Sequence, residues 1–420
     1  MDHLNYHQNE LWVEDIPLSK IISEVQTPCY VYSHRTLTEG MQSFANAFQS
    51  HPHMICYAVK ANGNLAILNT FAKLGSGFDI VSGGELSRVI AAGGNSQKVV
   101  FSGVGKTEEE IAFALKQHIF CFNVESKSEL TLINQIAAHQ NCKAPIALRV
   151  NPDVDPKSHP YISTGLKENK FGIPFEEALN LYQIAQTLPH LTIKGIACHI
   201  GSQLTSLAPM SDATQRLLYL IEALKEHGVL LNHIDVGGGL GVRYRDETPP
   251  SIIEYADAIK KLVPSSLKLL LEPGRILTAH AGILLTKVLT LKSSGAKNFC
   301  IVDSGMNDLL RPALYHAWHD IIAVKQNASH PIIYDVVGPI CESSDFLGKD
   351  RSLAIQSGDY LAILSVGAYG FSLSSNYPSR PRACEVMVKG NAFKIIRARE
   401  TIEQLINQEK IWNDSEEMAQ

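Results

Sequence analysis

Residues 54–60 read MICYAVK, a short apolar run that ends in a lysine. Seven further runs of this kind follow before residue 275, and most of them end at a glycine or a polar residue. They are GFDIVS (77–82), KVVFSG (98–103), FCFNVE (120–125), IALRVN (146–151), IKGIACHI (193–200), HIDVGG (233–238) and LKLLLEPG (267–274). Near-continuous apolar runs are typical of strands that are buried on both faces, as in parallel sheets.

The segments between these runs predict helices. Three of them begin with a hydroxyl residue and have a glutamate three positions later, which is the pattern of a capping box. These pairs are Thr107 with Glu110, Ser126 with Glu129, and Ser251 with Glu254. Eight strands with helical crossovers over roughly 230 residues predict a (β/α)₈ TIM-like barrel, in the α/β class.

After Gly274 the pattern changes, because alternating apolar runs appear with little helical periodicity between them. These runs are TKVLTLKS (286–293), NFCIVDS (298–304), PIIYDVVG (331–338), DYLAILSV (359–366) and ACEVMVKG (383–390). The early run TPCYVYS (27–33) precedes the barrel and needs a sheet to pair with. We therefore expect an N-terminal segment at 1–35 that pairs with a C-terminal β domain at 281–420, and a barrel at 36–280.

Composition narrows the class of protein. The chain has 420 residues, 45% hydrophobic and 19% charged, which is typical of folded globular proteins. Its formal net charge is −5 and no block of like charge is present, which disfavours nucleic acid as a partner. No signal segment or apolar span is visible, so we expect a cytoplasmic protein with no membrane partner. Eight scattered cysteines without C-x-x-C pairs indicate neither a disulfide framework nor a metal site.

Active sites of such barrels form at the C-terminal ends of the strands, where this sequence places four unusual groups. Lys60 follows an apolar strand, where desolvation is expected to lower the pKa of its ammonium and free the amine to bond to an aldehyde. The glycines at 237–239 would let a phosphate approach backbone N–H groups. Glu272 could keep a pyridine nitrogen protonated, and His199 could stack on a flat ring.

Each of these groups also has an ordinary structural explanation. The lysine could extend its charged end from a barrel rim, and the glycines could make a tight turn. Glu272 could form a salt bridge at the rim, and His199 could be a hydrogen-bonded core residue. Their joint occurrence at four strand ends favours a site for pyridoxal 5′-phosphate (PLP).

Several motifs make a likeness to a known family specific. The chain resembles the fold type III PLP-dependent decarboxylases nearly end to end, which implies an alanine racemase-like barrel with a C-terminal β domain. The motifs are YAVKAN (57–62), FDIVSGGEL (78–86), RVNPDVDP (149–156), an H-x-Y-I-x-T-G loop that ends in KFG (159–172), HIGSQ (199–203), DVGGGLG (235–241) and EPGR (272–275). The branch of this family that acts on meso-diaminopimelate is most similar in three segments, DSGMNDLLRPALYHAWH (303–319), GPICESSD (338–345) and GAYGFSLSSNY (367–377).

The resemblance implies which residues hold the cofactor. Lys60 would carry PLP covalently, His199 would stack on its ring, and Glu272 would meet the pyridine nitrogen. The other implied cofactor residues are Asp79, Ser202, Gly238, Gly239, Gly274, Arg275 and Tyr369.

The resemblance also implies the substrate residues and a proton donor. Arg275, Arg311 and Tyr315 would bind a carboxylate, Glu342 the distal ammonium, and Tyr369 would lie near both cofactor and substrate. Cys341 would be the acid that returns a proton to carbon and would complete the catalytic set with Lys60 and His199, although its apolar run alone also suits a buried thiol. In relatives, the residues that correspond to Cys341 and Glu342 come from the second subunit. The resemblance therefore implies a homodimer with shared active sites.

The implied reaction is the decarboxylation of meso-2,6-diaminopimelate to L-lysine and carbon dioxide, the last step of bacterial lysine synthesis. A decarboxylase of the ornithine, arginine or carboxynorspermidine type is an alternative, which Arg311 with Tyr315 and Glu342 disfavour. A second alternative is a PLP racemase, which Glu272 disfavours. A third alternative is an inactive relative that binds partners, which the presence of Lys60 and Cys341 disfavours. Pro378 stands where the family commonly has asparagine, and we expect a local change in that loop.

Overall fold

The computed structural model describes residues 3–155 and 169–412. Eight parallel strands form a closed barrel in the order β9-β11-β12-β13-β5-β6-β7-β8, and the pairing of β8 with β9 closes the ring. The strands are β5 (His53–Ala58), β6 (Gly77–Ile80), β7 (Val99–Phe101), β8 (Cys121–Val124), β9 (Ala144–Asn151), β11 (Leu191–Ala197), β12 (His233–Asp235) and β13 (Lys268–Leu271). The predicted barrel is therefore confirmed, with each predicted strand in its place.

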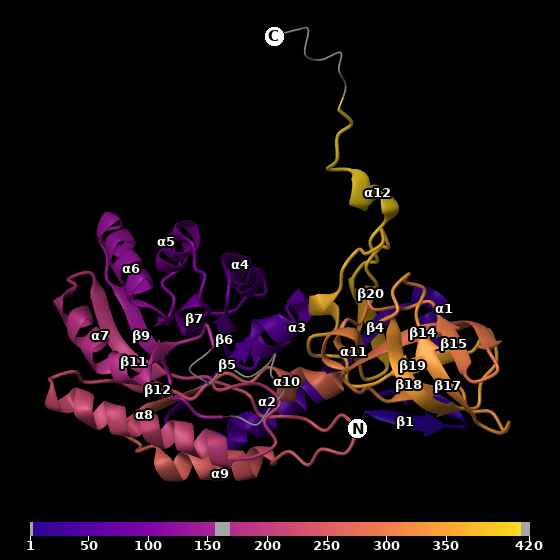
Figure 1. Ribbon diagram of the computed structural model, residues 1–420, viewed down its shortest axis with the longest axis horizontal. Coiled ribbons are helices and arrows are strands. Elements are labelled where there is room, and N and C mark those ends of the chain that lie inside the picture. The colour runs from indigo at the N-terminus through magenta and orange to yellow at the C-terminus, as the bar shows by residue number, and fades with distance from the viewer. Residues whose placement is uncertain (1–2, 156–168, 413–420) are drawn as a thin grey trace, which may run out of the picture.

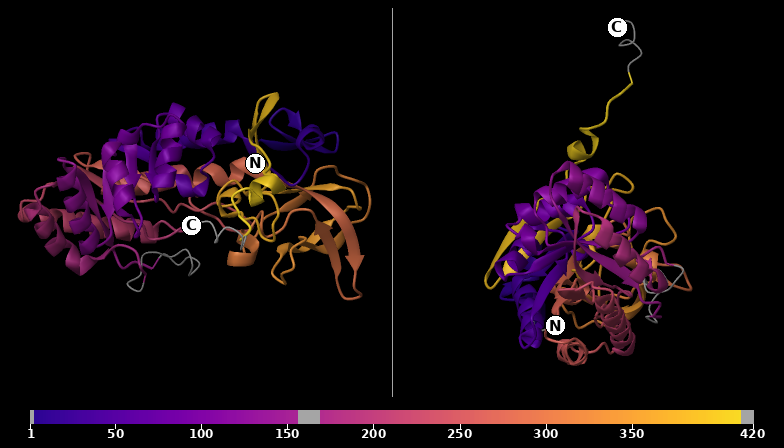
Figure 2. Two further views of the ribbon diagram at one scale, coloured as in Figure 1. Left: turned by 90° about the horizontal axis from the view of Figure 1, so that it is seen from above. Right: turned by 90° about the vertical axis from the view of Figure 1, so that its left-hand side faces the viewer.

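Helices surround the barrel (Figure 1; Figure 2, right). They are α2 (His34–Phe48), α3 (Leu65–Lys73), α4 (Gly83–Ala91), α5 (Glu108–Lys116), α6 (Lys127–His139), α7 (Phe175–Thr187), α8 (Ala208–Glu226), α9 (Ile252–Leu262) and α10 (Arg275–Thr278). A two-residue strand, β10 (Ile173–Pro174), extends the sheet beside β9. The H-x-Y-I-x-T-G motif lies outside the described residues.

The predicted capping boxes at Thr107 and Ser251 are confirmed, with both reciprocal hydrogen bonds present. At Ser126 only one of the two predicted capping hydrogen bonds is present, so this prediction is half wrong. The Ser126 hydroxyl accepts from the Glu129 N–H, but the Glu129 carboxylate accepts from the Glu125 N–H (2.8 Å) and from Lys106 (2.6 Å). A buried lysine from the preceding strand–helix loop competes for the carboxylate, which sequence spacing within one helix could not reveal.

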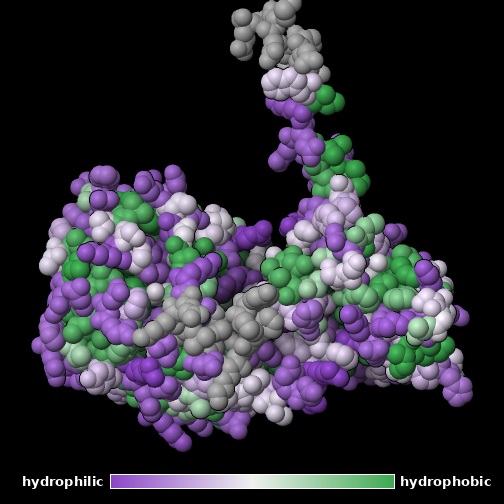
Figure 3. Space-filling model, in the orientation of Figure 1, coloured by the Kyte–Doolittle hydropathy of each residue, from purple (hydrophilic) through white to green (hydrophobic). Residues whose placement is uncertain are grey.

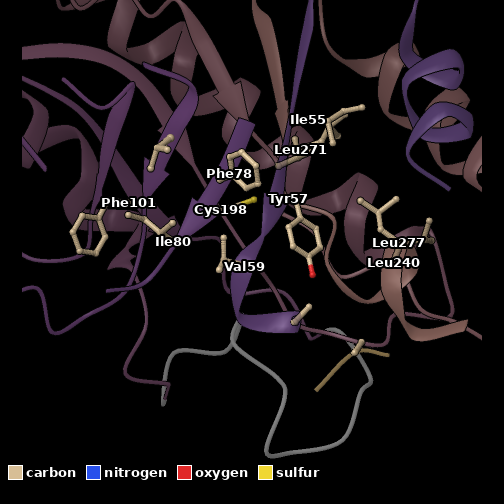
Figure 4. Packing of buried hydrophobic residues seen from close by; sticks show 14 of the residues in the cluster. Ile55, Tyr57, Val59, Phe78, Ile80, Phe101, Cys198, Leu240, Leu271 and Leu277 are labelled. Atoms are coloured by element: carbon tan, nitrogen blue, oxygen red, sulfur yellow. The ribbon is translucent and has the colours of Figure 1, made fainter. Parts of the chain in front are cut away.

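Large apolar side chains fill the barrel and the layer beneath its helices (Figure 4). Tyr57, Phe78, Phe101 and Phe122 come from four consecutive strands and are fully buried. The rings of Tyr57 and Phe71 lie 4.4 Å apart, which joins β5 to α3. Buried rings of this size contribute a large share of the hydrophobic stabilisation. Their close packing holds the ends of the strands in fixed positions.

A second, mostly antiparallel sheet packs beside the barrel (Figure 1). It contains β4 (Cys29–Ser33), which pairs with β14 and β20 and so joins the start of the chain to its end. Its other strands are β14 (Gly282–Ser293), β15 (Asn298–Val302), β16 (Ile321–Ala323), β17 (Ile332–Val337), β18 (Phe346–Leu353), β19 (Tyr360–Ile363), β20 (Cys384–Lys389) and β21 (Ala392–Arg397). The division at 1–35, 36–280 and 281–420 stays a prediction.

The first and last described segments of the chain lie on the side of this second sheet. Strands β1 (Leu4–His7), β2 (Glu10–Val13) and β3 (Ile16–Pro17) form a small sheet, followed by α1 (Leu18–Val25). After β21 the described chain leaves the body as an arm that includes α12 (Ile402–Ile406) (Figure 1). Its apolar side chains, coloured green in Figure 3, are largely exposed. No helix in the described part of the chain is long and apolar enough to cross a membrane.

Candidate active site at the barrel mouth

The amine of Lys60 lies against the carboxylate of Asp79. Lys60 sits in a 3₁₀ turn, Val59–Ala61, directly after β5, while Asp79 is on the neighbouring strand β6, where it is opposite Ala58. The two side chains form an ion pair in which the carboxylate is fully buried. Neighbouring strands of a parallel barrel end at the same edge, which is why two residues 19 positions apart meet here.

This ion pair overturns the expected pKa of Lys60. Burial by itself lowers the pKa of an ammonium, but the charges of Asp79 and Glu272 outweigh it and raise the pKa above its ordinary value. Lys60 is therefore a cation in this arrangement. Its amine must lose a proton before it can attack an aldehyde, and Asp79 is the nearest group that can accept one.

Three glycines after β12 line a hollow, and none of these three positions has room for a side chain. Gly237 and Gly239 have φ of +70° and +102°, which side-chain-bearing residues rarely adopt. A Cβ on Gly238 would lie 2.1 Å from the carbonyl oxygen of Glu272, so any larger residue would push β12 and β13 apart. Gly274 faces the same hollow, close to Ala58.

His199 is fixed as a neutral ring beside this hollow. Its Nδ1 accepts a hydrogen bond from the N–H of Gly238 (3.2 Å). An accepting Nδ1 places the ring proton on Nε2. Burial, then the charges of Arg149 and Lys60, hold the pKa of His199 well below its ordinary value. A neutral, oriented imidazole suits stacking on a flat ring.

A pair of buried carboxyl groups forms the floor of the site. Glu272 follows β13, and Asp235 ends β12; they are 8% and 0% exposed and hydrogen bond to each other. Burial, then the charges of Asp235 and Asp79, raise the pKa of Glu272 well above its ordinary value. The positive charge of Lys60 offsets only part of this rise, and no cation among the described residues pairs directly with Glu272. A protonated pyridine nitrogen would supply such a partner.

A cavity of about 440 Å³ is lined by Lys60 and shares His199, Ser202, Arg275 and Tyr369 with the glycine hollow. Arg275 donates to the hydroxyl of Ser202 (2.9 Å), and its guanidinium carbon lies 4.9 Å from the ring centre of Tyr369. Arg311 and Tyr315 enter from α11 (Arg311–Tyr315). The N–H of Tyr369 donates to the carbonyl of Ala61 (2.8 Å), which ties the second sheet to the lysine turn.

Comparison with known proteins decides the family. The family described as "Pyridoxal-dependent decarboxylase, pyridoxal binding domain" matches residues 34–279. Diaminopimelate decarboxylase of Vibrio cholerae is 56% identical over 408 residues, which is 96% of this chain and 98% of the relative. The corresponding enzyme of Haemophilus influenzae is 55% identical, with the same coverage. This chain belongs to the diaminopimelate decarboxylase family.

Solved structures of the family share the whole fold. Diaminopimelate decarboxylase from M. jannaschii has a TM-score of 0.94 at 38% identity, and the match covers 98% of each chain. The Helicobacter pylori enzyme, solved in complex with L-lysine, has a TM-score of 0.90 at 43% identity and covers 93% of this chain and 98% of its own. The cofactor of this pyridoxal-dependent family is PLP.

The diaminopimelate decarboxylase site on this chain fits that cofactor. The glycine hollow with Ser202 and Arg275 could hold a phosphate, His199 could cover the ring, and Glu272 could meet the nitrogen. When bound, PLP supplies an electron sink for the pair left on carbon as carbon dioxide departs. Among the described residues, no group of three histidine, cysteine, aspartate or glutamate side chains could hold a metal ion.

Two predicted residues of the diaminopimelate decarboxylase site do not lie at this cavity. Cys341 and Glu342 are exposed in the connection between β17 and β18 and do not line the space beside Lys60. The Glu342 carboxylate instead accepts from the hydroxyl of Tyr377 (2.7 Å), next to the Pro378 that departs from the family pattern. A thiol buried in an apolar run is therefore the wrong description of Cys341.

Several residues around the diaminopimelate decarboxylase site were missed by the sequence analysis. Asp235 was quoted only as part of a strand, yet it is the partner of Glu272. The amide of Asn123 lies 3.4 Å from Asp235 and 3.5 Å from Glu272. Tyr244 accepts from Arg275 (2.8 Å). The signal for Asp235 and Asn123 was a polar residue inside an otherwise apolar barrel strand; nothing in the sequence distinguished Tyr244.

Proposed function

We propose that this chain uses PLP on Lys60 to decarboxylate meso-2,6-diaminopimelate to L-lysine and carbon dioxide. The observation that carries the proposal is a pair of buried guanidinium groups, Arg275 and Arg311, at the cavity beside Lys60. Neither is paired with a carboxylate of the described residues; they contact the Ser202 and Tyr244 hydroxyls and a histidine ring. Buried cations without counter-charges are costly unless an anion joins them.

Diaminopimelate brings two carboxylates to such a site. One of them leaves as carbon dioxide, and the other needs a permanent cationic partner. The planar fork of arginine matches a carboxylate with two parallel hydrogen bonds. Ornithine and arginine have no second carboxylate, so their decarboxylation would leave the guanidinium of Arg311 unmatched. The relative from Helicobacter pylori was solved with L-lysine, the product of the proposed reaction.

The first test is a panel of substrates offered to the PLP-loaded protein. Carbon dioxide release is expected from meso-diaminopimelate, and release from ornithine, arginine or lysine is expected to be lower in kcat/KM by at least about 10³-fold. The reason is that a buried charged group left unpaired costs several kcal/mol. Comparable turnover of ornithine would contradict the proposed substrate, and absence of turnover with all four would contradict the activity.

We also propose a homodimer in the cytoplasm, with each active site shared between two copies. A second cavity of about 600 Å³ opens beside Lys60 and is lined by Arg88, Arg382 and Arg397 and by two glutamates, Glu85 and Glu385. Cys341 and Glu342 do not line the cavity beside Lys60 in their own copy, and an acidic loop from a second copy that entered here would meet the arginines. In this arrangement Cys341 returns the proton to carbon and Glu342 binds the distal ammonium.

Mixing two inactive variants tests the shared site. Lys60→Ala and Cys341→Ala are each expected to lose most of their activity. If subunits are exchanged at random, about half of the dimers would be mixed, and each would hold one intact site, so about a quarter of the wild-type activity should return. Activity that does not recover, although native mass spectrometry shows mixed dimers, would mean that each copy uses its own Cys341.

A further inference from the structure

His319 contacts Arg311, does not line the cavity beside Lys60, and was not a candidate site residue. It is fully buried, and its ring accepts from the Arg311 guanidinium at Nε2 (2.9 Å). Its Nδ1 lies 2.8 Å from the carbonyl oxygen of Leu364, at the end of β19. A carbonyl can only accept, so Nδ1 carries the proton.

This arrangement specifies one tautomer of a neutral ring. With the proton on Nδ1, Nε2 of a neutral imidazole is an acceptor, and the Arg311 N–H is its donor. Burial, followed by the charge of Arg311, holds the pKa of His319 well below its ordinary value, so the ring stays neutral near pH 7. Arg311 is thus hydrogen bonded without being neutralised.

Tyr244 completes the support from a third direction. Its ring packs edge-on against His319, with centres 5.3 Å apart, and lies 4.5 Å from the guanidinium carbon of Arg311. Its hydroxyl accepts from Arg275 (2.8 Å). An aromatic face and a phenol oxygen both attract cations, so two like-charged side chains can stay near the same cavity.

We propose that His319 is a positioning residue for substrate selection: it fixes the direction of the Arg311 fork while leaving its full positive charge for the non-reacting carboxylate of the substrate. A carboxylate in the same place would also hold the fork, but it would cancel that charge. A smaller residue would leave the charge but release the fork. The inference rests on the function proposed above, because it needs a substrate with a second carboxylate.

Two variants of equal size separate these effects. His319→Gln places an amide oxygen where Nε2 accepts, and His319→Glu places a carboxylate there. Both lose the donor to Leu364, so their packing defects match. We expect His319→Gln to keep the KM for meso-diaminopimelate within about 5-fold of wild type, and His319→Glu to raise it by at least about 30-fold, with a smaller change in kcat. PLP content and the melting temperature of the loaded protein are measured alongside.

The outcomes are distinct. Equal KM values for the two variants, or an effect of His319→Glu confined to PLP content, would overturn the inference even if the wild-type protein decarboxylates diaminopimelate. Lack of wild-type turnover would instead overturn the proposed function. If His319→Glu does not accumulate as folded protein, His319→Ala takes its place: it removes the acceptor without adding charge, and a KM no higher than that of His319→Gln would overturn the inference.

Discussion

Replacing Lys60 with alanine is expected to lower kcat/KM for meso-diaminopimelate by at least about 10³-fold, because no other lysine of residues 3–155 and 169–412 lines the site. Among the described residues, Lys60 is the lysine that lines both the glycine hollow and the 440 Å³ cavity. The strand before its turn is held to the EPGR segment by the hydrogen bond from the Ala58 N–H to the Pro273 carbonyl (3.1 Å). The visible absorption of covalently held PLP should disappear with the activity. Absorption spectra before and after borohydride, together with carbon dioxide release, measure both effects.

Lys106→Ala is the matched control. Lys106 is also a buried lysine near a strand end, and it is also paired with a carboxylate, that of Glu129 (2.6 Å). Its loss should lower stability, since it leaves a buried carboxylate unpaired, but the borohydride-sensitive band should remain. A Lys60→Ala protein that keeps this band, or a Lys106→Ala protein that folds and loses it, would move the attachment point away from Lys60.

Arg311→Ala is expected to raise the KM for meso-diaminopimelate by about 10²- to 10³-fold, as a buried charged hydrogen-bond partner of the substrate is removed. Arg311 is 6% exposed and lines the cavity beside Lys60, but it does not line the glycine hollow that could hold the phosphate. PLP content should therefore change little. Initial rates over a range of substrate concentrations, with PLP determined by absorbance, give both quantities.

Arg311→Lys serves as the control for charge alone. A lysine keeps the positive charge but lacks the planar fork, so its KM should fall between those of the wild type and Arg311→Ala. If Arg311→Ala lost PLP while its KM, measured with saturating PLP, stayed at the wild-type value, Arg311 would belong to the cofactor site and not to the substrate site.

The barrel could be predicted because most residues of its strands are buried on both faces, so each strand appears as a short, near-continuous apolar run, such as the run that ends at Lys60. The charge state of Lys60 could not. Its pKa depends on Asp79 and Glu272, which come from two other strands. The apolar residues before Lys60 indicate burial, and burial alone gives the wrong direction.

The contacts that His319 and Tyr244 make with Arg311 also could not be predicted from the sequence. His319 follows Arg311 by eight positions, but its role depends on a carbonyl at Leu364 and on Tyr244 from a loop of the barrel. Three segments far apart in the chain meet there. Cys341 shows the converse: the apolar run before it suited a buried thiol, whereas the thiol is exposed. Its role as proton donor, which the likeness to the family implied, stays a prediction.

The seam between β13 and β5 joins the last strand of the barrel to the first, with Leu269 opposite His53. Lys60 and Glu272 stand on the two sides of this seam, more than 200 residues apart in sequence. A nascent or partly unfolded chain, in which the ring is still open, cannot present both groups to one ligand. Added PLP should therefore bind the native state and not the unfolded one. The melting temperature of the protein should then rise as the concentration of PLP is increased.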